Sequence, residues 1–125
     1  MPLAHFYLLG FGLLSVAFGL AYLLSPAGLT EAADFGSLSP AASTDIRATY
    51  GGFQLGMGLF LLWSSRSAER YAGGLLLVVL VMGLVLASRA LGLLLDGGPN
   101  DFHKSALVFE SLLTLTSFAV WRRVR

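Results

Sequence analysis

Four long apolar runs separated by short polar segments restrict this chain to very few folds. The runs cover residues 3–24, 46–63, 71–95 and 102–121, and each has about the length with which a helix crosses a bilayer, roughly 17–25 residues. The mean hydropathy is +0.77, and 12% of residues are charged, against about a quarter in soluble domains. We therefore predict one all-α domain over residues 1–125, an integral-membrane, antiparallel four-helix bundle that crosses the membrane several times.

The positions of the basic residues predict the orientation of this bundle. Five of the eight lie between the second and third runs or after the fourth: Arg66, Arg70, Arg122, Arg123 and Arg125. Because Lys and Arg are enriched in cytoplasmic segments, we predict that both termini are cytoplasmic and that the acidic loops at residues 26–44 and 96–100 lie outside. Trp63 and Trp121 then fall at the cytoplasmic interface, where tryptophan is enriched.

Glycines recur at helical spacing within the apolar runs. Gly12 and Gly19 share one face of the first predicted helix, and Gly52 and Gly56 form a Gly-x-x-x-Gly pair in the second. Lipid gives apolar helices no hydrophobic drive to associate, so small residues that permit close backbone approach mark helix contacts in membranes. We predict that these four glycines pack against other helices, within the chain or across an oligomer.

Two ionisable side chains lie inside the predicted spans. At about 1.5 Å per residue, Arg89 lies roughly 9 Å below the end of the third run and Glu110 roughly 12 Å below the start of the fourth. The short connecting loop makes these helices adjacent and antiparallel, so the two depths match. Because either charge alone in hydrocarbon would cost several kcal/mol, we predict that the two side chains form an ion pair.

Further polar residues on the second run fall at a similar depth. With the ion pair they form a predicted cluster in the extracytoplasmic half of the bundle: Arg47, Tyr50, Gln54, Arg89 and Glu110. One interpretation is a structural network that fixes helix register. The other is a ligand site open to the outside, in which an arginine engages an acidic or carbonyl head and the apolar half holds a tail. Arg47 lies close enough to the boundary to extend to the interface instead.

Other chemistries find little support in the sequence. A net charge of +1 leaves no basic surface for nucleic acid, and the absence of cysteine excludes thiolate catalysis. His5 and His103 fall on opposite sides of the predicted membrane and cannot share a metal ion, and the serines lack a histidine base at depth. We predict no catalytic residue, no metal and no cofactor; an enzyme in which Glu110 protonates an apolar substrate is the remaining enzymatic alternative.

The segment at residues 44–56, TDIRATYGGFQLG, carries the pattern D-x-R-A-x-Y-G-G at the head of the second run, and Arg89-x-x-Gly92 and Glu110 follow it. In these residues the chain resembles an uncharacterised family of small four-span bacterial membrane proteins. The resemblance implies a location in the bacterial inner membrane and no particular activity. It also implies four functional positions: Arg47, Tyr50, Arg89 and Glu110. In architecture alone, the layout is similar to DoxX-like bundles, which are associated with quinone or redox complexes.

These observations lead to two hypotheses for the function. The first is a binding protein for a lipid, quinone or other lipophile, which would enter a polar pocket from the extracytoplasmic side. The second is a structural or accessory subunit of a larger membrane complex, or a homo-oligomer, with its glycine-rich faces against partner helices. A cavity containing a small molecule would favour the first, and glycine faces buried against other chains would favour the second.

Overall fold

The computed structural model describes residues 2–125, which are helical almost throughout and contain no strand. In chain order the elements are α1 (Pro2–Leu24), α2 (Pro26–Thr30), the 3₁₀ turn η1 (Glu31–Ala33), α3 (Pro40–Ile46), the π-helical segment η2 (Arg47–Gly52), α4 (Phe53–Ser64), α5 (Ala68–Asp96) and α6 (Asp101–Val124). The prediction of an all-α protein is confirmed. By length and composition, α1 and α5 are able to cross a membrane, with mean hydropathies of 2.0 and 2.4.

The elements α3, η2 and α4 follow one another without a break and form one helical rod over residues 40–64. The rod begins at Pro40, whereas the second apolar run begins at residue 46. The Ser39 hydroxyl accepts a hydrogen bond of 3.1 Å from the amide of Ala42, and proline takes the first helical position. Such a cap starts a helix whatever the hydropathy of its first turns, which is why the apolar run marks this start too late.

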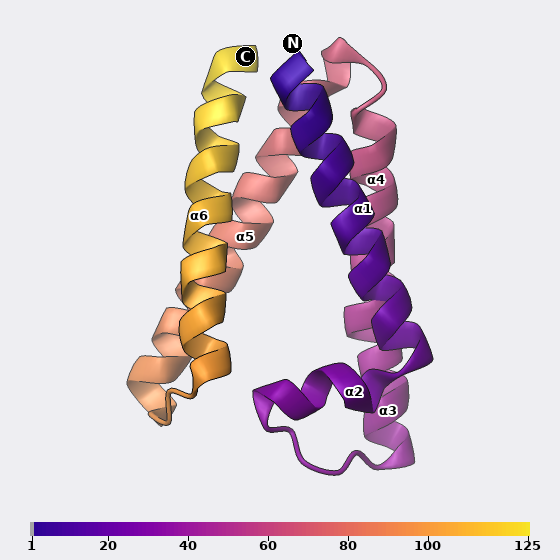
Figure 1. The fold of residues 1–125 in the computed structure, drawn as a ribbon, viewed down its shortest axis with the longest axis vertical. Coiled ribbons are helices and arrows are strands. Elements are labelled where there is room, and N and C mark those ends of the chain that lie inside the picture. Colours follow the sequence, from indigo (N-terminus) through magenta and orange to yellow (C-terminus); the bar gives the residue numbers. More distant parts are fainter. Residues whose placement is uncertain (1) are drawn as a thin grey trace.

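The long helical segments are arranged as two pairs (Figure 1). α1 packs along α4 and η2, and α5 packs along α6, whereas contacts between the two pairs are fewer. The pairs meet at the end that holds both termini and the turn at residues 65–67, here called the closed end. They diverge toward the end that holds α2, α3 and the turn at residues 97–100, here called the open end. The segments therefore form a wedge and not an evenly packed bundle.

The apolar core lies mainly in the closed half of the wedge. Its buried members come from all four long segments: Ala4, Leu8, Phe11, Met57, Leu61, Leu75, Val78, Met82 and Val120. Leu8, Leu61 and Leu75 are completely buried. The close packing of these side chains gives van der Waals contacts between the two pairs, so the closed half holds the pairs together.

Hydrogen bonds also join α1 to its neighbours at the closed end. The Tyr7 hydroxyl lies 2.8 Å from the Thr116 hydroxyl and 2.9 Å from the Ser117 hydroxyl, both on α6. His5 donates from Nδ1 to the carbonyl oxygen of Ser65, in the turn between α4 and α5, over 2.7 Å. Together these bonds fix the position of α1 against both the rod and α6, and the separation of the pairs increases from this point.

Two of the four predicted packing glycines lie at a close helix contact, between α1 and the rod. A Cβ added at Gly12 would lie 3.1 Å from the Gly58 carbonyl oxygen, and one added at Gly19 would lie 2.7 Å from the Leu55 amide nitrogen. Gly52 and Gly56, by contrast, have nothing within 4 Å of that position. Against the described residues 2–125 they make no close helix contact, and their packing across an oligomer stays a prediction.

Alanine at Gly19 is expected to lower the free energy of unfolding by about 1–3 kcal/mol, because its methyl group would collide with backbone atoms of the rod. The matched variant Gly56→Ala should be neutral or stabilising by up to about 1 kcal/mol, because the position is open and alanine favours the helix. Thermal unfolding of both variants in one detergent measures the difference. Equal stability of the two variants would contradict the close contact at Gly19.

Large apolar side chains cover the outer faces of the wedge. Phe6, Leu59, Leu84 and Leu115, one from each long segment, are 66%, 59%, 66% and 67% exposed. Soluble monomers rarely expose contiguous apolar surface on this scale. The outer surface thus has the character of one that contacts lipid or other apolar helices.

Candidate ligand-binding site

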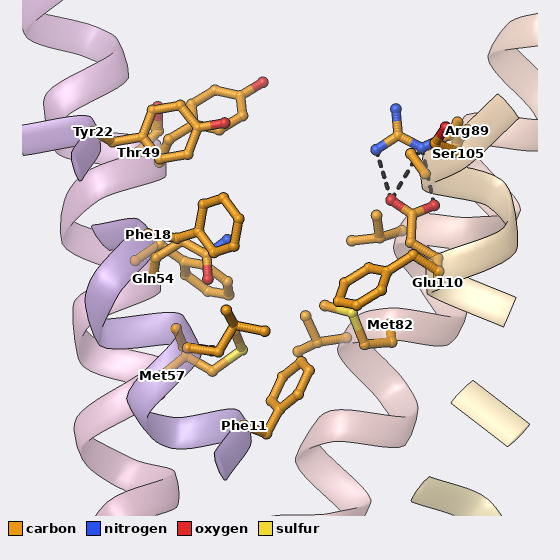
Figure 2. Close-up of a pocket in the computed structure, with 18 of the residues that line it drawn as sticks. Phe11, Phe18, Tyr22, Thr49, Gln54, Met57, Met82, Arg89, Ser105 and Glu110 are labelled. Atoms are coloured by element: carbon orange, nitrogen blue, oxygen red, sulfur yellow. Dashed lines mark hydrogen bonds and ion pairs between the residues drawn. The ribbon is translucent and has the colours of Figure 1, made fainter. Parts of the chain in front are cut away.

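A cavity of about 710 Å³ occupies the space between the two helix pairs (Figure 2). This volume lies within the range of roughly 300–1,000 Å³ that is usual for small-molecule sites. One wall comes from α1, η2 and α4, and the other from α5 and α6. The lining residues are Phe11, Leu14, Ser15, Phe18, Tyr22, Thr49, Tyr50, Phe53, Gln54, Met57, Val81, Met82, Val85, Arg89, Phe102, Ser105, Ala106, Phe109 and Glu110.

The turn between α5 and α6 brings the charged residues of the second wall together. Gly97 and Gly98 have φ angles of 69° and 70°, a left-handed region that glycine adopts without steric cost. The Asn100 side chain then caps α6, because its Oδ1 accepts a hydrogen bond of 2.9 Å from the amide of His103. This turn sets α5 and α6 side by side and antiparallel, with Arg89 facing Glu110 (Figure 2).

The predicted Arg89–Glu110 ion pair is present and has several contacts. The guanidinium donates from Nε to Oε1 at 3.0 Å and to Oε2 at 2.9 Å, and from Nη2 to Oε1 at 2.6 Å. The Glu110 side chain is 8% exposed and that of Arg89 is 21% exposed. Such geometry is typical of the stronger arginine–carboxylate pairs, and it leaves Arg89 partly facing the cavity.

His103 is a third member of this polar group. Its Nδ1 lies 3.0 Å from Nη1 of Arg89. Because a guanidinium only donates, Nδ1 is the acceptor, and the imidazole is the neutral form with its proton on Nε2. The ring of Phe102 lies 5.7 Å from Cζ of Arg89 and adds a cation–π contact.

The opposite wall carries uncharged polar groups. The rings of Tyr22 on α1 and Tyr50 on η2 lie 5.3 Å apart, and Gln54 follows one turn further along the rod. Figure 2 shows Tyr22 and Gln54 across the cavity from Arg89 and Glu110. The predicted polar cluster is thus divided between two walls, and among the described residues that line the cavity no hydrogen bond crosses from one wall to the other.

Arg47 does not line the cavity. Its Nη1 donates to the carbonyl oxygen of Leu23, one of the last carbonyls of α1, where a cation also meets the negative end of the helix dipole. The sequence prediction grouped Arg47 with Gln54 because both fall at a similar depth in the second apolar run, which does not fix the face on which each side chain lies. The π-helical segment η2 has i→i+5 hydrogen bonds and a wider turn, so Arg47 falls on another face.

Polarity changes along the length of the cavity. The polar side chains Tyr22, Arg89 and Glu110 lie on the side of the open end, whereas Phe11 and Met57 line the opposite, apolar part (Figure 2). Phe11 and Met57 also belong to the core of the closed half. The cavity is therefore amphipathic, with its polar part at the open end.

Two features of the site are absent from the predicted site residues: Tyr22, which lines the cavity, and the hydrogen bond between Arg89 and His103. A signal for each exists in the sequence. Tyr22 follows Ser15 by seven residues, and Glu110 follows His103 by seven, so each pair shares one helix face. Because His103 and Glu110 lie on the same face of α6, the sequence marks His103 as a polar neighbour of the buried glutamate.

The model of the family described as "domain of unknown function (DUF4345)" matches residues 3–121. The chain belongs to this DUF4345 family. No curated protein matches the chain significantly, and no solved structure does. The prediction that the chain belongs to an uncharacterised family is confirmed. Two finer predictions stay predictions: that the D-x-R-A-x-Y-G-G pattern marks the family, and that the chain is similar to DoxX-like bundles.

Proposed function

We propose that this chain is a multi-pass membrane protein of the bacterial inner membrane that binds a lipid, quinone or other lipophile in the cavity between its helix pairs. The observation that carries the proposal is the amphipathic cavity of about 710 Å³, polar at the open end and apolar toward the closed end. A molecule with a polar head and an apolar tail matches this distribution. No covalent chemistry is required of the protein.

Placement in a membrane is supported by the surface. Large apolar side chains are exposed on each long segment, and α1 and α5 have the length and hydropathy of spanning helices. At the closed end, Cζ of Arg70 lies 4.1 Å from the ring centroid of Trp63, and Cζ of Arg125 lies 4.6 Å from that of Trp121. Arginine and tryptophan together are typical of a membrane–water interface.

The chemistry of the lining supports a bound head group at the open end. Arg89, with a side chain 21% exposed, has N–H groups beyond those that Glu110 and His103 accept. Tyr22, Tyr50 and Gln54 offer further donors and acceptors from the opposite wall. A ligand between the walls would satisfy both sets, and its tail would contact the methionine and phenylalanine side chains.

The second candidate is an accessory subunit or a homo-oligomer, and one observation favours it. Gly52 and Gly56 lie one turn apart on an open face of the rod. Small residues at this spacing permit close approach of a helix from another chain. Assembly through this face is compatible with ligand binding, because the cavity lies on a different side of the rod.

Native mass spectrometry of the wild-type protein from lipid nanodiscs tests the proposal. The proposal predicts a stoichiometric small-molecule adduct that resists collisional activation better than bulk lipid does. Protein ions without any retained adduct would contradict lipophile binding. Assembly with partner chains and no adduct would support the accessory subunit instead.

The proposed orientation has both termini cytoplasmic and the open end outside. The chain contains no cysteine, so single-cysteine variants at Ser37 and Ser67 carry unique labels. An impermeant maleimide added to intact spheroplasts should label position 37 and leave position 67 unlabelled. Labelling of position 67 but not 37 would reverse the orientation, and labelling of both would contradict a membrane boundary between them.

A further inference from the structure

From the charges of the cavity we infer that the site selects a lipophile with an uncharged head that both accepts and donates hydrogen bonds, such as a diacylglycerol, and excludes lipids with a charged head. This inference rests on the proposed function and adds the class of head group. Three features of the open end support it: the balance of charge in the cavity, the uncharged polar groups, and the acidic surroundings.

The charged groups that line the cavity cancel each other. Arg89 and Glu110 are its only lining residues with a formal charge within residues 2–125, and three hydrogen bonds join them. An anionic head would compete with the Glu110 carboxylate for the guanidinium, and a cationic head would compete with Arg89 for the carboxylate. Either competition would leave one of two partly buried charges without its partner, which is costly in a low-dielectric site.

The remaining polar groups are uncharged. His103 accepts at Nδ1 from Arg89 and is therefore the neutral imidazole. On the opposite wall, Tyr22, Tyr50 and Gln54 offer hydroxyl and amide groups, which both donate and accept. Such groups discriminate by hydrogen bonding, and a site built in this way rejects molecules that leave its polar groups without partners.

The surroundings of the open end do not favour an anion. Five acidic residues belong to the segments at this end: Glu31, Asp34, Asp45, Asp96 and Asp101. The segments at the open end carry two basic residues that do not line the cavity, and both have partners. Arg47 donates to the Leu23 carbonyl, and Nζ of Lys104 lies 3.5 Å from Oδ1 of Asp101. A phospholipid or fatty-acid anion approaching from this end would meet a negative field.

Competition between matched lipids in nanodiscs tests the inference. Dioleoylglycerol and dioleoyl phosphatidate share the same two oleoyl tails and differ in the head, which is uncharged in the first and anionic in the second. Oleylamine, with a single oleyl chain, serves as the cationic probe. In native mass spectra of the wild-type protein at pH 8, retention of dioleoylglycerol should exceed that of either charged probe at least about tenfold, the ratio set by one charge-assisted hydrogen bond.

Replacing either charged side chain by an uncharged amide should largely abolish the selectivity. Glu110→Gln keeps a hydrogen-bond acceptor but leaves the positive charge of Arg89 without its partner, and should raise the phosphatidate-to-dioleoylglycerol ratio about tenfold. Arg89→Gln leaves the negative charge of Glu110 without its partner, and should raise the oleylamine-to-dioleoylglycerol ratio about tenfold. If one variant does not fold, the other still applies. Glu69→Gln makes the same change in net charge on an exposed residue of the closed end and should leave all ratios unchanged.

The possible outcomes separate this inference from the proposed function. Equal retention of charged and uncharged heads by the wild type, or a preference for either charged probe, would overturn the inference and leave lipophile binding intact. Retention of none of the three probes would contradict the proposed function itself. A shift with Glu69→Gln as large as with Glu110→Gln would show that net charge, and not the cavity, sets the ratios.

Discussion

Replacing Glu110 with leucine is expected to lower the free energy of unfolding by about 3–5 kcal/mol, the usual cost of leaving one member of a buried ion pair alone. The guanidinium of Arg89 cannot release its proton, so it stays charged beside an apolar side chain. Arg89→Leu should cost less, because the carboxyl group that remains can take up a proton and become neutral. Thermal or denaturant unfolding in detergent micelles measures the loss of stability in each variant.

The double variant Arg89→Leu with Glu110→Leu supplies the control. Replacing a buried ion pair by apolar residues is often nearly neutral, so the double variant should regain most of the stability that Glu110→Leu loses. If the pair also serves a ligand, as proposed, the double variant should fold but lose the bound lipophile. Additive losses of the two single variants would contradict their direct pairing.

Tryptophan at Val85 is expected to reduce the bound lipophile at least about tenfold, the equivalent of about 1.4 kcal/mol in binding. Val85 lines the cavity on α5, and an indole in place of its isopropyl group would occupy space that the ligand needs. The unfolding midpoint should change little, because Val85 is 36% exposed and outside the core of the closed half. Adduct retention in native mass spectra measures the effect.

The adjacent residue provides a matched control. Leu84 is 66% exposed and does not line the cavity, so Leu84→Trp adds the same side chain to the same turn of α5 on its outer face. This variant should keep the adduct. Loss of the adduct in both variants would mean that the tryptophan disturbs α5 as a whole, and retention in both would place the ligand outside the cavity.

Hydropathy and spacing predicted the long helices well, because apolar runs of this length have few other conformations. They predicted the ends less well. The cap at Ser39 starts the rod within a polar segment, and α2 and η1 form in the predicted loop, where no apolar periodicity marks them. The wedge could not be predicted either, because the separation of two helices depends on contacts between distant residues, such as that of Tyr7 with Ser117.

The candidate site was predictable to the extent that it obeys simple rules. The depths of the two residues and the adjacency of their helices were sufficient to predict the Arg89–Glu110 pair. Both follow from the number of residues between each side chain and the short turn that joins the helices. Arg47 contacts the Leu23 carbonyl and not the cavity, and the π-helical segment at whose start it lies has no recognisable mark in the sequence. Tyr22 was not among the predicted site residues, because its place at the cavity depends on the divergence of the pairs, which opens a space in front of it.

The proposed function requires that a lipophile occupies the cavity between the two helix pairs. An experimental density map of the wild-type protein in lipid nanodiscs tests this most directly. We expect one elongated non-protein density, with its polar end between Arg89 and Tyr22 and its apolar part along Met57 and Phe11. A map in which the helix pairs close on each other, or in which side chains of a second copy fill the cavity, would contradict it.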